Sequence, residues 1–240
     1  MAKDLENTMV GNNVYILTEL SKETTNGLIT QLSQWVDRIP FKNNLQLPQK
    51  PDEKDITEDT VYIIGNNNYA NAYAPYDAIP ENTPVLNVWI NSGGGKDNVT
   101  QSFLTILNIA AAKGTIIKTY NLRQAGSNAS IIAISGTKGY RYMAESAFNY
   151  IHFGDKSGHI SHENEMEFVI ADFKYFVNET KDIYLNKTNL TKKELQKYFN
   201  IEGSGIMSAK QCLEKGICDW VITNDGRFVN KVSDLKSKQR

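Results

Sequence analysis

Apolar positions along the chain follow two periods, which together predict strands alternating with helices. Short runs rich in β-branched and aromatic residues predict strands at 14–18, 85–90 and 115–120. Between the first two strands, one buried helical face is predicted by the spacing of Leu28, Ile29, Leu32 and Trp35. A second helix is expected at about 99–112, with apolar positions at Phe103, Leu104, Leu107 and Ile109.

The alternation continues in the second half. The stretch NLRQAGSNASIIAIS (121–135) predicts a small-residue turn and an apolar helix, and TKGYRYMA and AFNYIHF predict two short strands. SAKQCLEKG predicts a helix closed by a C-cap glycine, and ICDWVI predicts the last strand. Before them, a long amphipathic helix is expected to have one face formed by Met166, Val169, Phe173, Phe176 and Val177. This order predicts an α/β fold with crossover connections, in a single domain covering 1–240.

Two segments depart from the pattern. Residues 37–84 are rich in proline and asparagine and contain the charged run PDEKDITED, which indicates a loop-rich insert with one strand candidate at 61–65. Surface decoration is the first interpretation of this insert; capping a chamber or binding a partner are the alternatives. The tail at about 231–240 is charged and expected to be loose.

Composition narrows the classes of function. A hydrophobic fraction of 40% and a net charge of −1 are ordinary for a soluble domain, and they give no electrostatic case for nucleic acid or an anionic membrane. The N-terminal stretch lacks the apolar core of a signal peptide, so a cytoplasmic setting is expected. Cys212 and Cys218 are expected to be free thiols rather than a disulfide or a zinc site.

A nucleophilic serine is the main chemical candidate. Ser127 stands at the expected start of a helix, and His152 ends a strand-like run, the rigid position that a general base needs. The glycines of NSGGG (91–95) follow a strand and can present bare amides to an oxyanion. Each feature has a plain alternative: a helix N-cap, a structural histidine and a tight turn. His159 and His162 lie in a polar stretch and are expected to be exposed.

Several motifs, in order, resemble the Clp protease proteolytic subunit family. INSGGG (90–95) is similar to the family's INSPGG, and RQAGS (123–127) to its GQAAS, which carries the nucleophile. Without a gap from that serine, YIH (150–152) falls on the family's catalytic MIH and GTKGYR (136–141) on its KGKR-type turn. IMSAKQCLEKGICDWVI (206–222) and VYILTELSKETTNGLI (14–29) resemble its last helix–strand unit and its first strand and helix.

This resemblance implies a crotonase-like α/β fold of repeated β-α-β units with a protruding handle helix, and it assigns roles. Ser127 would be the nucleophile, with Ser130 the second choice, and His152 the base. The amides of Gly94 and Asn128 would form the oxyanion hole. Counting back from IMSA, the family's catalytic aspartate falls on Asn200.

The acid position is a departure from the family. Asparagine can hold an imidazole in one tautomer but offers it no negative charge. Glu202, two residues on, is the alternative. IEGSG (201–205) also replaces a charged stretch that the family uses between rings, which puts ring-to-ring assembly in question.

Three functions follow as hypotheses. The first is a serine peptidase working in a homo-oligomeric ring on unfolded polypeptide delivered by an AAA+ ATPase. The chain has no nucleotide-binding loop of its own, so no cofactor is expected. The second is a catalytically weakened structural or regulatory ring subunit, for which a phage origin is a guess about context. The third is acyl-CoA chemistry on the same fold, against which the serine–histidine spacing argues.

Overall fold

The computed structural model describes residues 7–17, 20–39, 79, 83–152, 163–198 and 205–235. Strands within these ranges form one nine-stranded sheet. They are β1 (Thr8–Val10), β2 (Asn13–Ile16), β3 (Val85–Ser92), β4 (Ile116–Gly126), β5 (Arg141–Ala144), β6 (Phe148–Ile151), β7 (Gly205–Ser208), β8 (Trp220–Ile222) and β9 (Phe228–Val229). The helices are α1 (Lys22–Asp37), α2 (Asp97–Ala112), α3 (Asn128–Ile134), α4 (Glu163–Lys187), α5 (Lys192–Tyr198) and α6 (Ala209–Glu214), followed by the 3₁₀ turn η2 (Val232–Asp234).

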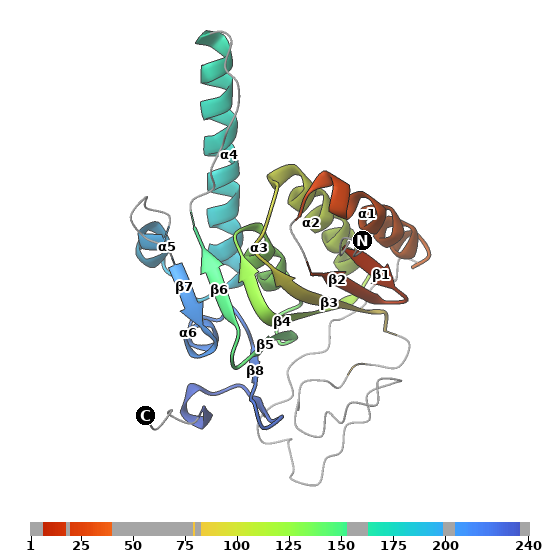
Figure 1. Ribbon diagram of the computed structural model, residues 1–240, viewed down its shortest axis with the longest axis vertical. Helices are drawn as coiled ribbons and strands as arrows, with labels where there is room; N and C mark the ends of the chain where they lie inside the picture. The colour runs from red at the N-terminus through yellow and green to blue at the C-terminus, as the bar shows by residue number, and fades with distance from the viewer. Residues whose placement is uncertain are drawn as a thin grey trace, which may run out of the picture.

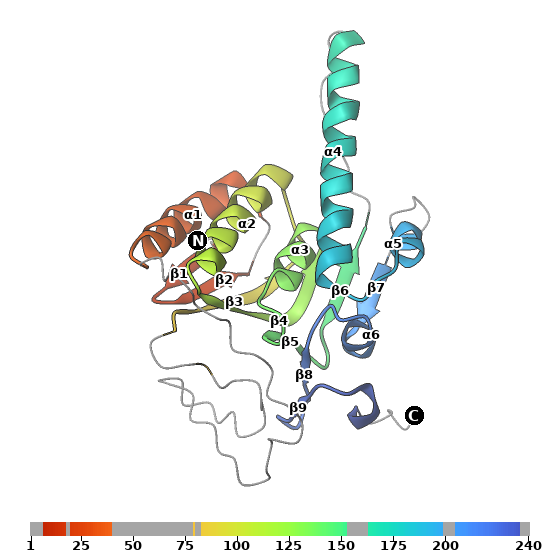
Figure 2. The same ribbon diagram turned by 180° about the vertical axis from the view of Figure 1, so that it is seen from behind.

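Parallel pairing dominates the sheet, in the order β1-β2-β3-β4-β5-β8-β9. The pairs β2–β3, β3–β4, β4–β5 and β5–β8 are parallel, while β1–β2 and β8–β9 are antiparallel. Helices α1, α2 and α3 lie side by side over one face, and α4 projects from α3 well beyond the rest of the molecule (Figures 1 and 2). The predicted α/β class and the protruding helix are therefore both present.

Strand β4 is the element that positions the candidate site. Its first half pairs with β5, from Thr119 to Asn121, and its second half pairs with β6, from Gln124 to Gly126. The sequence analysis placed a turn after residue 120, and this was wrong: β4 continues for six more residues. The reason is the change of partner, because β6 supplies a new hydrogen-bonding edge that small residues can approach closely.

The core lies between the sheet and its helices. Leu28 and Leu32 of α1 are buried against the strands, as are Phe103 and Leu107 of α2. Two predicted core positions were wrong, since Ile109 and Met166 are exposed. Ile109 lies in α2 and is 43% exposed, and Met166 lies in the first turn of α4 and is 49% exposed.

The other boundaries are close to the expectation. Helix α6 has a Ser208–Gln211 capping box and is followed by Gly216 at φ 65°, the C-terminal glycine that the sequence indicates. Strand β8 begins later than predicted, at Trp220. Four elements had not been predicted, because they are short or largely polar: β1, β7, β9 and α5. The insert's strand candidate at 61–65 lies outside the described residues.

Both cysteines are free and buried, as expected. Burial raises the pKa of the Cys212 and Cys218 thiols, which keeps them protonated. Across the described parts of the chain, no helix is long and apolar enough to cross a lipid bilayer.

Candidate active site

Ser127 occupies a strained turn between β4 and α3. Its backbone has φ 50° and ψ −126°, and it is the only non-glycine residue with positive φ in the described ranges. Such a conformation costs about 1–3 kcal/mol and persists only where surrounding structure enforces it. A helix N-cap usually has extended dihedrals and bonds its side chain to the helix, but Ser127 makes no such bond. Capping therefore does not explain this serine.

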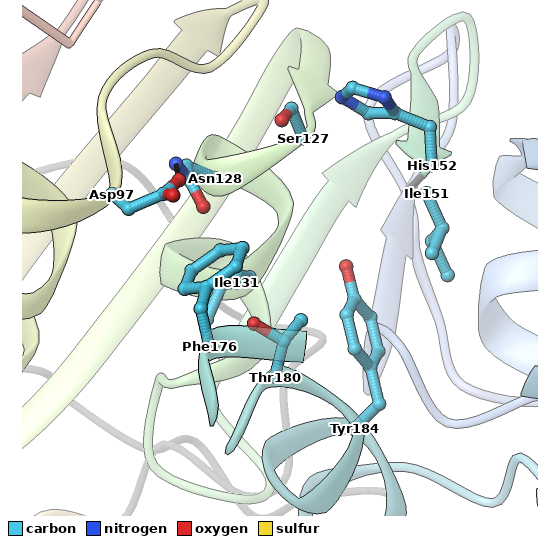
Figure 3. A pocket seen from close by; sticks show the side chains of 9 residues that line it. All are labelled: Asp97, Ser127, Asn128, Ile131, Ile151, His152, Phe176, Thr180 and Tyr184. Carbon is cyan, nitrogen blue, oxygen red and sulfur yellow. Dashed lines mark hydrogen bonds between the residues drawn. The ribbon is translucent and has the colours of Figure 1, made fainter. Parts of the chain in front are cut away.

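His152 follows directly after β6, beside the same turn. The Ser127 amide donates a hydrogen bond of 2.8 Å to the Tyr150 carbonyl, which ties the turn to β6. The imidazole stacks on the Tyr150 ring, with centroids 4.9 Å apart and planes at 11°. In Figure 3 the imidazole extends from the end of β6 toward Ser127. Nothing in the described ranges hydrogen-bonds the Ser127 hydroxyl to this ring; such bonds often form only when substrate binds.

The glycine turn packs directly on the serine. Gly94 has φ 114°, and a Cβ there would lie 2.6 Å from the Ser127 Cβ and 2.7 Å from the Gly126 carbonyl oxygen. Only glycine fits. The Gly94 amide donates to the Ser92 hydroxyl at 3.2 Å, a bond that an incoming oxyanion has to replace.

Asn128 joins the glycine turn to the start of α3. Its side-chain amide donates to the Gly95 carbonyl at 2.6 Å and to Asp97 Oδ1 at 2.8 Å. Its own backbone N–H belongs to the first helical turn, where amides have no partner within the helix. The side chain of Asn128 thus fixes the position of an amide that stands beside the serine.

Ser127, Asn128 and His152 line one pocket (Figure 3). Its wall is formed by Asp97, Ser127, Asn128, Ile131, Ile151, His152, Phe176, Thr180 and Tyr184. The space that the centre of a water molecule can reach is about 20 Å³, room for about one water. The Thr180 hydroxyl is buried and has no hydrogen-bond partner among the described residues, a state that costs about 1–3 kcal/mol.

Ser130, the second-choice nucleophile, lies in a different setting. It is fully buried, shares a 2.6 Å hydrogen bond with the Tyr184 hydroxyl and accepts one of 2.7 Å from the Asn149 side chain. Burial raises the pKa of Tyr184, so this network stays neutral. The hydroxyl of Ser130 is thereby committed to packing α3 against α4 and β6.

The remaining candidates lie outside the described residues. These are Asn200 and Glu202, between the end of α5 and the start of β7, and His159 and His162, before α4. In the described ranges, no group of three His, Cys, Asp or Glu side chains is placed to hold a metal ion.

The sequence also matches a known protein family. The Clp protease family profile matches residues 77–225, well over half of the chain. The chain belongs to the Clp protease family. The matched segment contains Gly94, Ser127, His152 and Asn200.

Individual relatives at low sequence identity are Clp protease proteolytic subunits as well. The ATP-dependent Clp protease proteolytic subunit of Streptococcus uberis is 27% identical over 148 residues, covering 60% of this chain and 72% of the relative. The subunit of the same name from Lactococcus lactis subsp. lactis is 26% identical, covering 60% and 71%. ATP-dependent Clp protease proteolytic subunit 4 of Rhodococcus jostii is 24% identical, covering 57% and 68%. These likenesses support a divergent Clp-type peptidase.

Several pocket residues had not been singled out from the sequence. Asp97 comes two residues after the glycine turn, and its proximity to that turn was the available signal. Thr180 and Tyr184 follow Phe176, which had been predicted, at intervals of four residues on α4, so they extend the same helical face. Which part of α4 crosses the site depends on packing between distant segments, and spacing alone does not give it.

Proposed function

We propose that this protein is a serine endopeptidase that cleaves unfolded polypeptides, with Ser127 as nucleophile and His152 as general base. The observation that carries the proposal is the strained, uncapped Ser127 in the wall of the pocket that also holds His152. A serine on a sharp strand-to-helix turn exposes its hydroxyl to substrate, which is the arrangement of nucleophile elbows.

Catalysis would proceed by acyl transfer. His152 takes the proton as Ser127 Oγ attacks the scissile carbonyl carbon, and the oxyanion accepts hydrogen bonds from the Gly94 and Asn128 amides. The tetrahedral intermediate collapses, the C–N bond breaks, and His152 gives its proton to the leaving amine. In the second half, His152 takes a proton from water as the water oxygen attacks the acyl carbon; the bond from that carbon to Ser127 Oγ then breaks, and His152 returns the proton to Oγ. Each oxyanion donor is worth about 2.7–4 kcal/mol in a well-formed site.

Asn200 completes the proposed triad, with Glu202 as the alternative. The carbonyl oxygen of Asn200 would accept from the imidazole N–H and fix its tautomer. Where aspartate was replaced by asparagine in another serine protease, kcat fell about 10⁴-fold, because the wrong tautomer was held. Activity here would thus depend on which end of the Asn200 amide faces the ring.

The working form would be a homo-oligomeric ring supplied by an AAA+ unfoldase. The relatives' names, ATP-dependent and proteolytic subunit, motivate this part of the proposal. We further propose that residues 1–240 form a single domain with an insert at 37–84, as the order of strands and helices indicates. The N-terminal sequence favours a cytoplasmic setting.

A fluorophosphonate probe tests the proposal directly. We expect it to modify Ser127 in the full-length protein, as located by peptide mass spectrometry, and to leave Ser127→Ala unmodified. Ser130→Ala is the matched control and should still be labelled at Ser127. No labelling, under conditions in which an active Clp peptidase is fully labelled, would reject the nucleophile and with it the peptidase.

One pair of observations favours the second candidate, a ring subunit with weakened catalysis. The Gly94 amide is already engaged by Ser92, and Ser127 lacks a hydrogen bond to the imidazole. The discriminating variant is Asn200→Asp. If it creates peptidase activity from an inactive wild type, the weakened subunit is correct; if the wild type is active and the variant gains little, the peptidase is.

A further inference from the structure

The polar character of the pocket wall points to the kind of residue that the substrate presents. Asp97, the first residue of α2, places a carboxylate in the same wall as Ser127. The Asn128 side chain holds one of its oxygens at 2.8 Å. An acidic residue in the first helical turn also suits the helix dipole, which accounts for its position in the chain but not for its place in the pocket.

A second observation is independent of Asp97. Thr180 is 4% exposed and lines the pocket, and within the described part of the chain its hydroxyl has no hydrogen-bond partner. It rises from α4 between Phe176 and Tyr184 (Figure 3). A buried hydroxyl without a partner in native structure calls for an explanation, and a ligand group that supplies the missing hydrogen bond is one.

We propose that this pocket selects a basic side chain, lysine or arginine, immediately before the scissile bond. This inference rests on the proposed function. The side chain before the scissile bond is attached one carbon from the carbonyl that Ser127 attacks, so a pocket whose wall contains Ser127 is where it enters. Its ammonium or guanidinium group donates hydrogen bonds to the Asp97 carboxylate and to the Thr180 hydroxyl.

The pocket wall also has an apolar part, to which Ile131 and Phe176 contribute. A long basic side chain can bury its methylenes against apolar walls while its charged end reaches polar groups. Because the space that the centre of a water molecule can reach is only about 20 Å³, part of the wall has to move when such a side chain enters.

Asp97 also has a consequence for chemistry. It is linked through the Asn128 side chain to the residue whose amide is the proposed oxyanion donor. A carboxylate so close to a developing oxyanion opposes its negative charge. A cation in the pocket compensates the carboxylate, so a basic substrate should gain in kcat as well as in binding.

The test uses two diaryl phosphonates that react with a catalytic serine and differ only in the side chain before the phosphorus. One carries lysine and the other carries norleucine, which has the same stem without the ammonium group. Second-order rates of Ser127 modification are measured on the full chain. We expect the lysine probe to react about tenfold faster, the ratio that 1.4 kcal/mol of differential binding gives.

Two variants assign the preference to its residues. Asp97→Asn keeps an acceptor for the Asn128 amide and removes only the charge, so it should bring the ratio close to one. Thr180→Val keeps the shape and should lower the ratio about threefold. Asp234→Asn, an exposed acid on η2, is the matched control and should change neither rate.

The outcomes separate the two proposals. If neither probe modifies Ser127, the peptidase is rejected and this inference with it. If both probes react and norleucine is equal or faster, or if Asp97→Asn leaves the ratio unchanged, the peptidase stands and the basic pocket is overturned.

Discussion

Two serines three residues apart show how differently one short segment treats the same side chain. Ser127 has a strained backbone and a half-buried side chain that does not cap the helix it precedes. Ser130 has ordinary helical geometry, is fully buried and is bonded to Tyr184 and Asn149. The first lowers stability and is available for chemistry, whereas the second holds elements together. Strain and unused hydrogen-bonding capacity mark the candidate nucleophile better than its residue type does.

A second buried polar cluster, which like that of Ser130 is hydrogen-bonded within the protein, lies at Arg141 of β5. Arg141 and Asp219 form a bidentate pair with N–O distances of 2.6 and 2.8 Å, and Arg141 is 3% exposed. The Asp219 carboxylate also accepts the amides of Gly139 and Arg141, and the guanidinium donates to the Lys187 carbonyl. The two buried charges thus pair with each other and bind main-chain groups as well, as buried charge requires. This cluster joins β5 to the residue before β8 and to the end of α4.

The largest effect is expected for Ser127→Ala. Removing the nucleophile of a serine triad lowers kcat by up to about 2 × 10⁶-fold, so we expect peptidase activity to fall to background. The melting temperature should change little, because the Ser127 side chain makes no hydrogen bond with the described residues that the variant would lose. Activity against a fluorogenic peptide and a calorimetric melt measure the two effects.

Ser127→Gly sharpens this first prediction. It removes the hydroxyl and also the backbone strain, so it should be more stable than Ser127→Ala by about 1 kcal/mol. Equal stability of the two variants would mean that the turn is not strained. A Ser127→Ala protein that retains most of its activity would place the nucleophile elsewhere.

Next in size is Asp219→Ala. Leaving the buried Arg141 guanidinium unpaired should lower the free energy of unfolding by about 3–5 kcal/mol. Urea titration followed by far-UV circular dichroism measures it, and activity per folded molecule should be unchanged. The control is Asp225→Ala, whose Arg227 partner is on the surface and whose loss should cost less than about 1 kcal/mol. Similar losses of stability in both variants would mean that burial of the Arg141–Asp219 pair does not make it costlier to break than a surface pair.

How far the sequence predicts this molecule depends on the range of the interactions. Local pattern correctly placed α1, α2, α4 and α6, because their apolar spacing and their terminal residues are local features. It stopped β4 too early, since the last residues of that strand are small and polar. They are extended only because β6, more than twenty residues later, pairs with them.

The same distinction between local and long-range interactions applies to the candidate site. Ser127, His152 and Gly94 could be proposed because separate motifs coincide in order, and the structure places the first two in one pocket wall. Thr180 and Asp97 escaped notice, because their significance comes from α4 and α2 meeting at the serine. The acid position, Asn200, stays a prediction.

Gly94→Ala tests whether the turn beside Ser127 has room for any change. The added Cβ would lie 2.6 Å from the Ser127 Cβ, and positive φ disfavours alanine as well. The backbone must shift and displace a proposed oxyanion donor, so kcat should fall about 10²–10³-fold. Steady-state kinetics give the value, with KM expected to change little.

The matched control for Gly94→Ala is Gly139→Ala. That glycine also has positive φ, but an added Cβ there would meet open space. It should lose about 1 kcal/mol of stability and no activity. If Gly94→Ala were fully active, Gly94 would not belong to the site.

Ser130→Ala tests the serine whose hydroxyl is hydrogen-bonded to two other buried side chains. It leaves the buried Tyr184 hydroxyl and the Asn149 amide each without one partner, and the expected loss of stability is about 1–3 kcal/mol. The double variant Ser130→Ala with Tyr184→Phe should lose less than the sum of the single changes, because both remove the same bond. Additive losses in a urea-denaturation cycle would show that the two hydroxyls act independently.

The smallest effect is expected at the start of α5, which leads toward Asn200. Glu194 accepts from the Lys215 ammonium at 2.7 Å and from the amide and hydroxyl of Thr191, and these bonds lower its pKa from 4.5 to about 2. A carboxyl whose pKa is lower in the folded state stabilises the fold above its unfolded value, and the contribution is lost as pH falls toward the folded value. Wild type should therefore exceed Glu194→Gln in stability above about pH 4.5, and the gap should close between pH 4.5 and 2. Both side chains are partly exposed, so added salt should narrow the gap as well.

Lys215→Met is the matched variant for Glu194→Gln. It removes the ion pair but keeps the hydrogen bonds from Thr191 to Glu194, so it should retain part of the pH dependence of stability. A difference between wild type and Glu194→Gln that did not vary with pH would mean that Glu194 contributes through packing rather than charge.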